Sequence, residues 1–201
     1  MFTIGITGGT ASGKTTLVEK AVAHYGSERV AVLSQDAYYK SNDMLSFIER
    51  SKLNFDHPNA FDFDLLYAHL LSLKKGISIH APMYSFTKHQ RTSKTQLISP
   101  KKILMVEGIL ILHDKRIVEL LDLKVFMEAP EKVRLARRIH RDHLERGRTE
   151  ADVKNRFQKT LKPMHILYIE PSKAIADIVI QNDSNKNDAF HVLLNSIPSS
   201  S

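Results

Sequence analysis

Short, continuously apolar segments alternate along the chain with longer segments in which apolar residues recur at helical spacing. The short segments cover residues 2–7, 29–33, 103–106, 124–127 and 176–180. Such segments are typical of strands in a parallel sheet that is buried on both faces, with the intervening helices packed against it. The pattern therefore predicts an α/β fold of three layers with a mostly parallel central sheet. In such sheets, ligands bind beyond the carboxyl ends of the strands.

Helices are predicted between these strands, at about residues 14–23, 63–75 and 114–121, from Pro130 onward and from about Thr149. The segment 63–75 is followed by Gly76, which suits a carboxy-terminal helix cap. Residues 77–84 alternate between apolar and polar and include a proline, which predicts a short edge strand or a small β-hairpin. The last residues, at about 196–201, are rich in serine and predict a flexible tail.

The composition fits one globular domain over residues 1–201, with 42% hydrophobic and 25% charged residues. The absence of cysteine excludes a disulfide scaffold and a thiolate zinc site, and it fits a reducing compartment such as the cytoplasm. No apolar segment approaches the roughly 18 residues of a membrane span, and no basic leader precedes the first strand. The net charge of +7 favours acidic partners, namely nucleic acid, anionic lipid or phosphorylated small molecules.

A glycine-rich loop follows the first predicted strand and opens the first helix. Residues 8–15, called the phosphate loop below, match the pattern G-x-x-x-x-G-K-[ST] at every fixed position. Gly8 and Gly13 let the backbone curl so that amide N–H groups face a polyphosphate, and the helix N-terminus adds its dipole. Lys14 reaches the β and γ oxygens, and the Thr15 hydroxyl ligates Mg²⁺. The predicted nucleoside triphosphate site comprises Gly8, Gly9, Thr10, Ala11, Ser12, Gly13, Lys14, Thr15 and Thr16.

Two acidic residues follow other predicted strands. Glu107 ends the apolar strand 103–106, as the second Walker element requires for holding the metal, although an ordinary strand-end glutamate looks the same. Asp36 follows the strand 29–33 and is therefore expected at the same edge of the sheet as the phosphate loop. A carboxylate there can accept the proton of a substrate hydroxyl during phosphoryl transfer, or it can cap a turn.

Two loop segments carry further candidate chemistry. Residues 54–62 and 84–91 mix aromatic and hydrogen-bonding side chains. This mixture suits a flat ligand but also occurs in surface loops. Phe55 is one of the substrate-binding candidates.

The predicted helix 131–148 holds seven basic residues. Among them, Arg134, Arg138 and Arg141 fall on one helix face at spacings of four and three residues. The basic residues form either a solvated helix face or a mobile lid whose arginines close over the phosphates. The phosphate loop favours the lid.

Taken in order, these segments resemble the uridine kinase (uridine–cytidine kinase) family of P-loop nucleoside kinases, within the phosphoribulokinase/uridine kinase group. The resemblance runs from residue 4 to about 180. Its most selective elements are Phe55-Asp56-His57-Pro58 and Arg141-Asp142-x-x-Glu145-Arg146-Gly147-Arg148. The other matching elements are residues 8–16, Gln35-Asp36-x-x-Tyr39, Tyr84-x-Phe86-x-x-His89-x-Arg91 and Glu107-Gly108-Ile109-Leu110.

The resemblance implies a role for each matching residue. Asp36 corresponds to the catalytic base that acts on the nucleoside 5′-hydroxyl, and Thr15 and Glu107 correspond to the Mg²⁺ shell. Lys14 acts on the transferred phosphate, and Arg141, Arg146 and Arg148 match lid positions near the phosphates and the substrate. The implied nucleoside contacts are Asp56 and Arg138 to the ribose hydroxyls, Tyr84 and His89 to the pyrimidine edge, and Tyr39 and Phe86 packed against the base.

The sequence departs from the family pattern around the acceptor. Arg156 stands where a glutamine that helps to hold the ribose is usual, so we count it among the substrate contacts. Ser85 stands where an aspartate is common. These changes bear on the identity of the nucleoside and leave phosphoryl transfer intact. The resemblance also implies an acceptor-binding insert at about 36–95, an arginine-rich helical lid at about 131–160, and a homotetramer, since the family is often tetrameric.

We therefore expect an enzyme that uses ATP or GTP with Mg²⁺ to phosphorylate a pyrimidine ribonucleoside, uridine or cytidine, at the 5′-hydroxyl. The product is UMP or CMP, as in pyrimidine salvage, and the partners are small molecules rather than nucleic acid or membranes. One alternative is a P-loop kinase of another small hydroxyl acceptor, of the sugar phosphate, pantothenate or glycerate type. Less favoured are a GTPase, suggested by Asn185-Lys186-Asn187-Asp188, and a nucleic-acid-binding protein, suggested by the charge.

Overall fold

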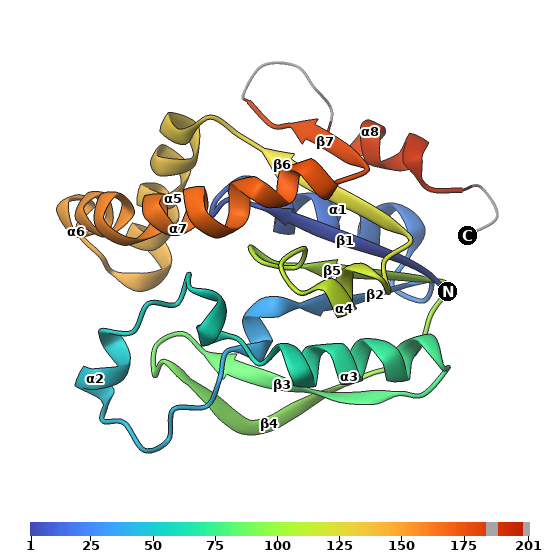
Figure 1. Ribbon diagram of the computed structural model, residues 1–201, viewed down its shortest axis with the longest axis horizontal. Helices are drawn as coiled ribbons and strands as arrows, with labels where there is room; N and C mark the ends of the chain where they lie inside the picture. The colour runs from blue at the N-terminus through green and yellow to red at the C-terminus, as the bar shows by residue number, and fades with distance from the viewer. Residues whose placement is uncertain (184–188, 199–201) are drawn as a thin grey trace.

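A five-stranded parallel sheet forms the centre of the computed structural model, which describes residues 1–183 and 189–198 (Figure 1). Its strands span Phe2–Gly8 (β1), Val30–Ser34 (β2), Ile103–Glu107 (β5), Leu123–Glu128 (β6) and Ile178–Gln181 (β7). They lie in the order β2-β5-β1-β6-β7, so β1 is the middle strand. Ile4 of β1 lies opposite Met105 of β5 on one side and Leu123 of β6 on the other.

One face of the sheet is covered by α1 (Lys14–Tyr25) and α8 (Ala189–Ser196). Leu17 of α1 and Leu193 of α8 are buried in the same hydrophobic cluster as Ile6 of β1. The two helices come from opposite ends of the sequence, and they lie beside each other on this face. The apolar side of each helix is thus buried against the continuously apolar strands, as the sequence pattern requires.

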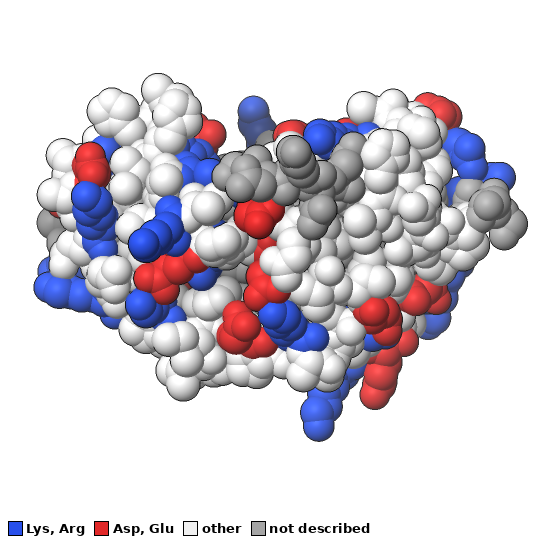
Figure 2. Space-filling view, turned by 90° about the horizontal axis from the view of Figure 1, so that it is seen from above, with Lys and Arg blue, Asp and Glu red and all other residues white. Residues whose placement is uncertain are grey.

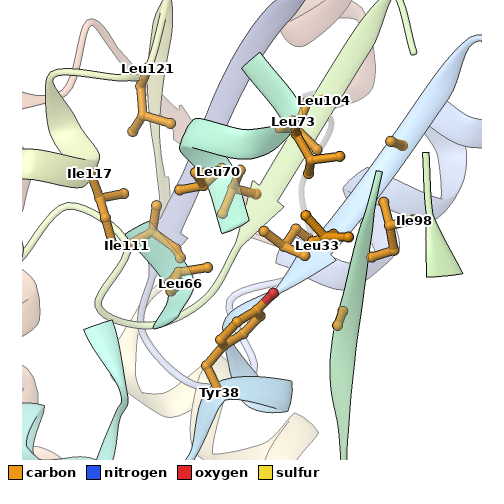
Figure 3. Packing of buried hydrophobic residues seen from close by; sticks show 14 of the residues in the cluster. Leu33, Tyr38, Leu66, Leu70, Leu73, Ile98, Leu104, Ile111, Ile117 and Leu121 are labelled. Atoms are coloured by element: carbon orange, nitrogen blue, oxygen red, sulfur yellow. The ribbon is translucent and has the colours of Figure 1, made fainter. Parts of the chain in front are cut away.

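The other face is covered by α3 (Phe63–Lys74) and α4 (Lys115–Val118). Leu70 of α3 is fully buried together with Leu33 of β2 and Leu104 of β5. Figure 3 shows these side chains between the helix and the strands, with neighbouring leucines of α3 on the same side of the helix. The three layers predicted from the sequence are therefore confirmed.

The segment between β2 and β5 contains the elements that extend the molecule below the sheet in Figure 1. It includes a β-hairpin whose strands are antiparallel, with Ile79 opposite Ile98, and the register shifts between Pro82 and Tyr84. Pro82 has no N–H to donate, which fits this irregular pairing. The elements are η1 (Gln35–Tyr38), α2 (Phe47–Ser51), η2 (Pro58–Ala60), α3, β3 (Ile79–Ser85) and β4 (Gln90–Ile98).

A helical region follows β6 and lies at the left of Figure 1, where the carboxyl ends of the strands point. It begins with α5 (Glu131–Arg146) and α6 (Glu150–Arg156). It then continues without a break, and it widens into π-helical turns on both sides of Pro163, which cannot donate the hydrogen bond of a regular turn. The later parts are η3 (Phe157–Leu161), α7 (Lys162–Met164), η4 (His165–Ile169) and η5 (Glu170–Ile175).

The structure corrects the sequence prediction at the carboxy-terminal end. Residues 196 and 197 do not belong to the flexible tail predicted at about 196–201, because α8 extends to Ser196 and Ile197 is buried in the core. Helix α4 ends at Val118, so it is shorter than the predicted segment 114–121. The tetrapeptide that suggested a GTPase, residues 185–188, lies outside the described residues. Within the described part of the chain, no helix is both long and apolar enough to cross a membrane.

Candidate functional site

The carboxyl ends of β1, β2 and β5 open into a cleft of about 620 Å³. Its walls come from the phosphate loop, from η1, from the loop before η2, from the tip of the β3–β4 hairpin, and from α5 and α6. The residues predicted from the sequence that line it are Thr10, Ala11, Gly13, Lys14, Thr15, Thr16, Asp36, Tyr39, Phe55, Asp56, Tyr84, Phe86, His89, Glu107, Arg138, Arg141, Arg148 and Arg156. Residues scattered over the whole sequence thus meet in one place.

Three predicted residues of the phosphate loop, Gly8, Gly9 and Ser12, are not among those that line the cleft. Gly8 ends β1 with φ +142°, and a Cβ atom at this position would collide with the carbonyl oxygen of Met127. Only glycine adopts this backbone conformation readily, and only glycine fits against the neighbouring strand. Gly8 therefore allows the backbone of the phosphate loop to pack against β6, although Gly8 itself does not line the cleft.

Lys14 is the first residue of α1, and it is almost completely buried. Its Nζ atom donates hydrogen bonds to the carbonyl oxygens of Gly8 (2.9 Å) and Gly9 (3.0 Å), so the amine is held across the phosphate loop. Burial lowers the pKa of Lys14, and the nearby carboxylates of Glu107 and Asp36 oppose that shift. A buried amine at a helix N-terminus is suited to bind an anion that replaces these carbonyl partners.

Glu107 and Thr15 offer oxygen ligands for a divalent cation. Glu107 ends β5, is buried, and lines the cleft together with Thr15. Ser34 of the neighbouring strand β2 donates a hydrogen bond to Glu107 Oε1 (2.7 Å), which fixes the orientation of the carboxylate. A carboxylate and a hydroxyl are the kind of ligands that Mg²⁺ uses when substrate phosphates and water complete its shell. The residues present therefore fit Mg²⁺.

Asp36 lies in η1, directly after β2, and it lines the cleft. The preceding residue, Gln35, is fully buried, and its Oε1 atom accepts a hydrogen bond from the backbone N–H of Leu110 (2.9 Å). This contact joins η1 to the segment after β5, so it fixes the position of Asp36. The charge of Asp36 also raises the pKa of Tyr84, although burial is the larger cause, and the pKa of Tyr84 reaches about 12.

Aromatic rings form the wall of the cleft on the side of the insert. Tyr39 packs on Phe61, with ring centroids 4.4 Å apart, and it also contacts Tyr84 (4.9 Å). Phe55 stacks on His89 at 5.1 Å. Burial raises the pKa of Tyr39 well above its usual value, and the negative charge of Asp36 raises this pKa further. These rings provide a flat apolar surface next to a carboxylate.

Two polar atoms of residues that line the cleft, one on this wall and one on α6, are buried without a hydrogen-bond partner among the described residues. They are the hydroxyl oxygen of Tyr84 and the Nε atom of Arg156. A buried donor without a partner is costly, so such atoms at the edge of a cleft are suited to meet a polar ligand. The aromatic residues and Arg156, all predicted from the sequence, line the same cleft.

Arginines of α5 and the following turn form the opposite wall. Arg138 is buried and donates a hydrogen bond to Thr10 Oγ1, which ties α5 to the phosphate loop. Arg141 and Arg148 line the cleft beside it. The charge of Arg141 contributes to the lowered pKa of Lys14, so the two cations lie close together. Arg146, also predicted here, has a side chain that lies outside the described part of the structure.

Sequence reasoning missed several features of α5. Arg137 lines the cleft, whereas Arg134 lines a second cavity of about 260 Å³ behind the phosphate loop. Helical spacing places Arg134 on one face with Arg138 and Arg141, but its Nε atom donates to the carbonyl of Ala129 (3.1 Å). The buried position of Asp142 among the arginines was also missed. Its place within the basic motif was the available signal.

Comparisons with known proteins identify relatives over most of the chain. The sequence model of the phosphoribulokinase / uridine kinase family matches residues 3–188. A uridine kinase from Clostridium perfringens is 46% identical over 191 residues, which cover 95% of this chain and 92% of that protein. A uridine kinase from Shewanella amazonensis is 43% identical over 194 residues, covering 94% of this chain and 92% of that protein.

Solved structures with low sequence identity share the fold. Phosphoribulokinase from Rhodobacter spheroides has a TM-score of 0.65 at 19% identity, with 94% of this chain and 73% of that chain covered. D-glycerate 3-kinase from Cryptococcus neoformans has a TM-score of 0.63 at 14% identity, with 90% and 86% covered. These neighbours confirm the predicted α/β architecture of P-loop kinases.

The contacts of Gly8 predict that the Gly8→Ala substitution damages both the fold and the phosphate loop. The added Cβ atom meets backbone rather than a flexible side chain, so we expect the free energy of unfolding to fall by about 2 kcal/mol or more. Binding of inorganic tripolyphosphate should be weakened at the same time. Urea denaturation and titration calorimetry measure the two effects.

Gly76→Ala is the matched control, because Gly76 also has a positive φ (+78°), but no atom of the described residues lies within 4 Å of where its Cβ would stand. This variant carries only the cost of the backbone conformation, about 1 kcal/mol, and keeps tripolyphosphate binding. Equal effects of the two substitutions would contradict the role assigned to the close approach of β6.

Proposed function

Because the chain belongs to the phosphoribulokinase / uridine kinase family, we propose that it transfers the γ-phosphoryl group of ATP or GTP to the 5′-hydroxyl of uridine or cytidine. Membership of this family makes the chain a kinase that transfers phosphate to a hydroxyl group. The observation that carries the choice of acceptor is the cleft, in which the phosphate loop faces an aromatic wall with polar atoms at its edge. The product would be UMP or CMP, as in pyrimidine salvage.

The donor triphosphate would lie on the phosphate loop and the N-terminus of α1. Lys14 would exchange its carbonyl contacts for phosphate oxygens, which carry full negative charge and are stronger acceptors. Thr15 and Glu107 would hold Mg²⁺, which supplies charge neutralisation of the β- and γ-phosphates when it is bound. Ser34 keeps the Glu107 carboxylate turned toward that position.

The acceptor would lie between the aromatic wall and Asp36. Asp36 would take the proton of the 5′-hydroxyl as the oxygen forms its bond to the γ-phosphorus and the bond to the nucleoside diphosphate breaks. Asp56 and Arg138 would contact the ribose hydroxyls, with Arg156 beside them. The buried hydroxyl of Tyr84 supports its role at the polar edge of the base, because that group needs a hydrogen-bond partner.

The arginine wall would balance charge during transfer. Arg141 lies near Lys14, and Arg148 lines the same cleft, so both can approach a triphosphate held by the loop. We assign the same function to Arg146 from its place in the motif. Closure of these helices over the phosphates would also exclude water, which otherwise competes with the nucleoside as an acceptor.

The alternatives receive less support. The acceptor of a sugar phosphate, pantothenate or glycerate kinase has no flat aromatic base. Such a kinase does not require an aromatic wall that combines stacked rings with a buried tyrosine hydroxyl that has no hydrogen-bond partner among the described residues. On the face seen in Figure 2, basic side chains are interspersed with acidic ones, and nucleic-acid binders present a continuous basic patch instead. Tetramer formation and a cytoplasmic location stay predictions.

A panel of acceptors tests the proposed function directly. The release of ADP or GDP is measured with ATP or GTP and Mg²⁺. The acceptors are uridine, cytidine, adenosine, guanosine, ribulose 5-phosphate, pantothenate and glycerate, and one reaction has no acceptor. We expect turnover with uridine or cytidine only, with the 5′-monophosphate as the product. Activity on another member of the panel, with none on the pyrimidines, would keep the kinase and overturn the nucleoside.

Asp36→Asn tests the catalytic base. The substitution keeps the shape of the side chain and removes its ability to accept a proton, so kcat should fall by roughly a hundredfold or more. Uridine binding, measured by calorimetry without a donor, should change little. Normal turnover of this variant would remove Asp36 from the mechanism.

His89→Gly tests recognition of the base. His89 has φ +50°, a conformation that glycine adopts without strain, so this substitution removes the ring and keeps the backbone conformation accessible. Loss of the stacked His89–Phe55 pair should raise KM for uridine about tenfold or more and leave KM for ATP unchanged.

Lys88→Gly is the matched control, because it adds the same flexibility to the same exposed turn without touching the stacked rings. Its kinetic constants should remain those of the unmodified protein. If both variants raised KM equally, the hairpin conformation rather than the His89 ring would be the cause.

A further inference from the structure

A single carboxylate on α5 contacts three arginines of the cleft. Asp142 is fully buried and does not itself line the cleft. Its Oδ1 atom lies 2.9 Å from Arg141 Nη2, and its Oδ2 atom lies 3.0 Å from Arg148 Nη1 and 3.5 Å from Arg138 Nε. All three arginines line the cleft. Asp142 thus contacts all three guanidiniums without lining the cleft itself.

The contacts of Asp142 reach the phosphate loop through one intermediate. Arg138, which pairs with Asp142, also donates to Thr10 Oγ1 in that loop. Arg141, which pairs with the same carboxylate, lies close enough to Lys14 for its charge to lower the lysine pKa. The position of one buried side chain therefore sets where two cations stand relative to the predicted triphosphate site.

Electrostatics gives this carboxylate a second effect. Three guanidiniums that converge in a partly desolvated region repel one another, and one buried negative charge offsets part of that repulsion. The cluster keeps an excess of positive charge for an incoming polyphosphate. The carboxylate also competes with phosphate for the same guanidiniums, so it weakens binding while it improves placement.

We propose that Asp142 is a positioning residue that holds Arg138, Arg141 and Arg148 in the geometry needed for phosphoryl transfer before the triphosphate binds. The same carboxylate weakens polyphosphate binding, because its negative charge cancels part of the attraction between the arginines and phosphate. The effect on turnover rests on the proposed function, whereas the effect on polyphosphate binding does not.

A role restricted to ending α5 would use other atoms. The backbone carbonyl of Asp142 accepts the N–H groups of Gly147 and Arg148, and these contacts close the helix regardless of the side chain. The Asp142→Asn substitution keeps the backbone and the shape of the side chain and removes the charge. It therefore separates the positioning role from the helix end.

The experiment compares Asp142→Asn with the unmodified protein in two assays at one fixed ionic strength. One is kcat with uridine, ATP and Mg²⁺, and the other is the affinity for inorganic tripolyphosphate by calorimetry. We expect kcat to fall about tenfold or more, because misplaced charge partners stabilise the transition state poorly. Tripolyphosphate should bind about threefold more tightly, because the competing carboxylate is gone.

Asp122→Asn is the control for loss of a carboxylate elsewhere. Asp122 accepts a hydrogen bond from the backbone N–H of Thr3 (2.7 Å) and pairs with Lys74, at the end of β1 away from the phosphate loop. It should lower thermal stability without changing kcat or tripolyphosphate affinity. A parallel loss of kcat, affinity and stability in Asp142→Asn would overturn the positioning role, as would an unchanged kcat.

A double variant covers the case in which Asp142→Asn does not fold. In Asp142→Asn/Arg148→Gln, one positive charge leaves together with the negative one, so the balance of charge is restored. The proposal expects a lower kcat in this protein than in Arg148→Gln alone, because Arg138 and Arg141 still lose their partner. Equal kcat values would contradict it.

The two proposals fail in different ways. If the unmodified protein phosphorylated no pyrimidine nucleoside, the proposed function would be wrong. The kcat assay of Asp142→Asn would then use the acceptor found in the panel instead of uridine. If the unmodified protein did not bind tripolyphosphate, the arginines would not meet phosphate and the positioning role of Asp142 would be wrong.

Discussion

Repulsion between cationic side chains is the constraint around which the cleft is built. The basic residues that line it are Lys14, Arg137, Arg138, Arg141, Arg148 and Arg156. Without a ligand, these charges are stable only if carbonyl oxygens and carboxylates surround them, since a buried charge needs a partner. Lys14 uses the carbonyls of its own loop, and three of the arginines, Arg138, Arg141 and Arg148, use Asp142. The carbonyl partners of Lys14 can be exchanged for phosphate oxygens, whereas Asp142 keeps its three arginines in place. The contacts that stabilise the free protein therefore also prepare it for a polyanion.

Strand topology explains why this cluster forms at one point. In a parallel sheet every strand ends at the same edge, so loops far apart in the sequence meet there. The phosphate loop follows β1. Glu107 ends the neighbouring strand β5, and Asp36 follows β2, the next strand beyond β5. The sheet fixes these positions through the apolar side chains of its core. Function is therefore added at the strand ends without cost to the packing that holds them.

The sequence allowed prediction of the strands, the phosphate loop and the cleft residues, because these depend on local pattern and spacing. It failed where long-range packing decides. Arg134 and Arg138 share a helix face, yet Arg134 lines the cavity behind the phosphate loop and Arg138 lines the cleft, because Arg134 donates to the carbonyl of Ala129 and Arg138 donates to Thr10. Helix α8 was missed because it has only eight residues, and a helix this short gains its stability from the core that it contacts. The burial of Asp142 likewise follows from tertiary contacts alone.

Under the proposed function, the cleft divides into a donor side and an acceptor side that are carried by different parts of the chain. The phosphate loop and Glu107 come from the sheet strands and the start of α1, whereas the aromatic wall comes from the segment between β2 and β5. Kinases named for ribulose phosphate and for glycerate share this fold at 14–19% identity. A common sheet with different acceptors is expected if the inserted segment alone determines what is phosphorylated. Under the proposed function, recognition of the nucleoside would depend on the aromatic wall with Tyr39 and Tyr84, and the phosphate loop would serve the donor.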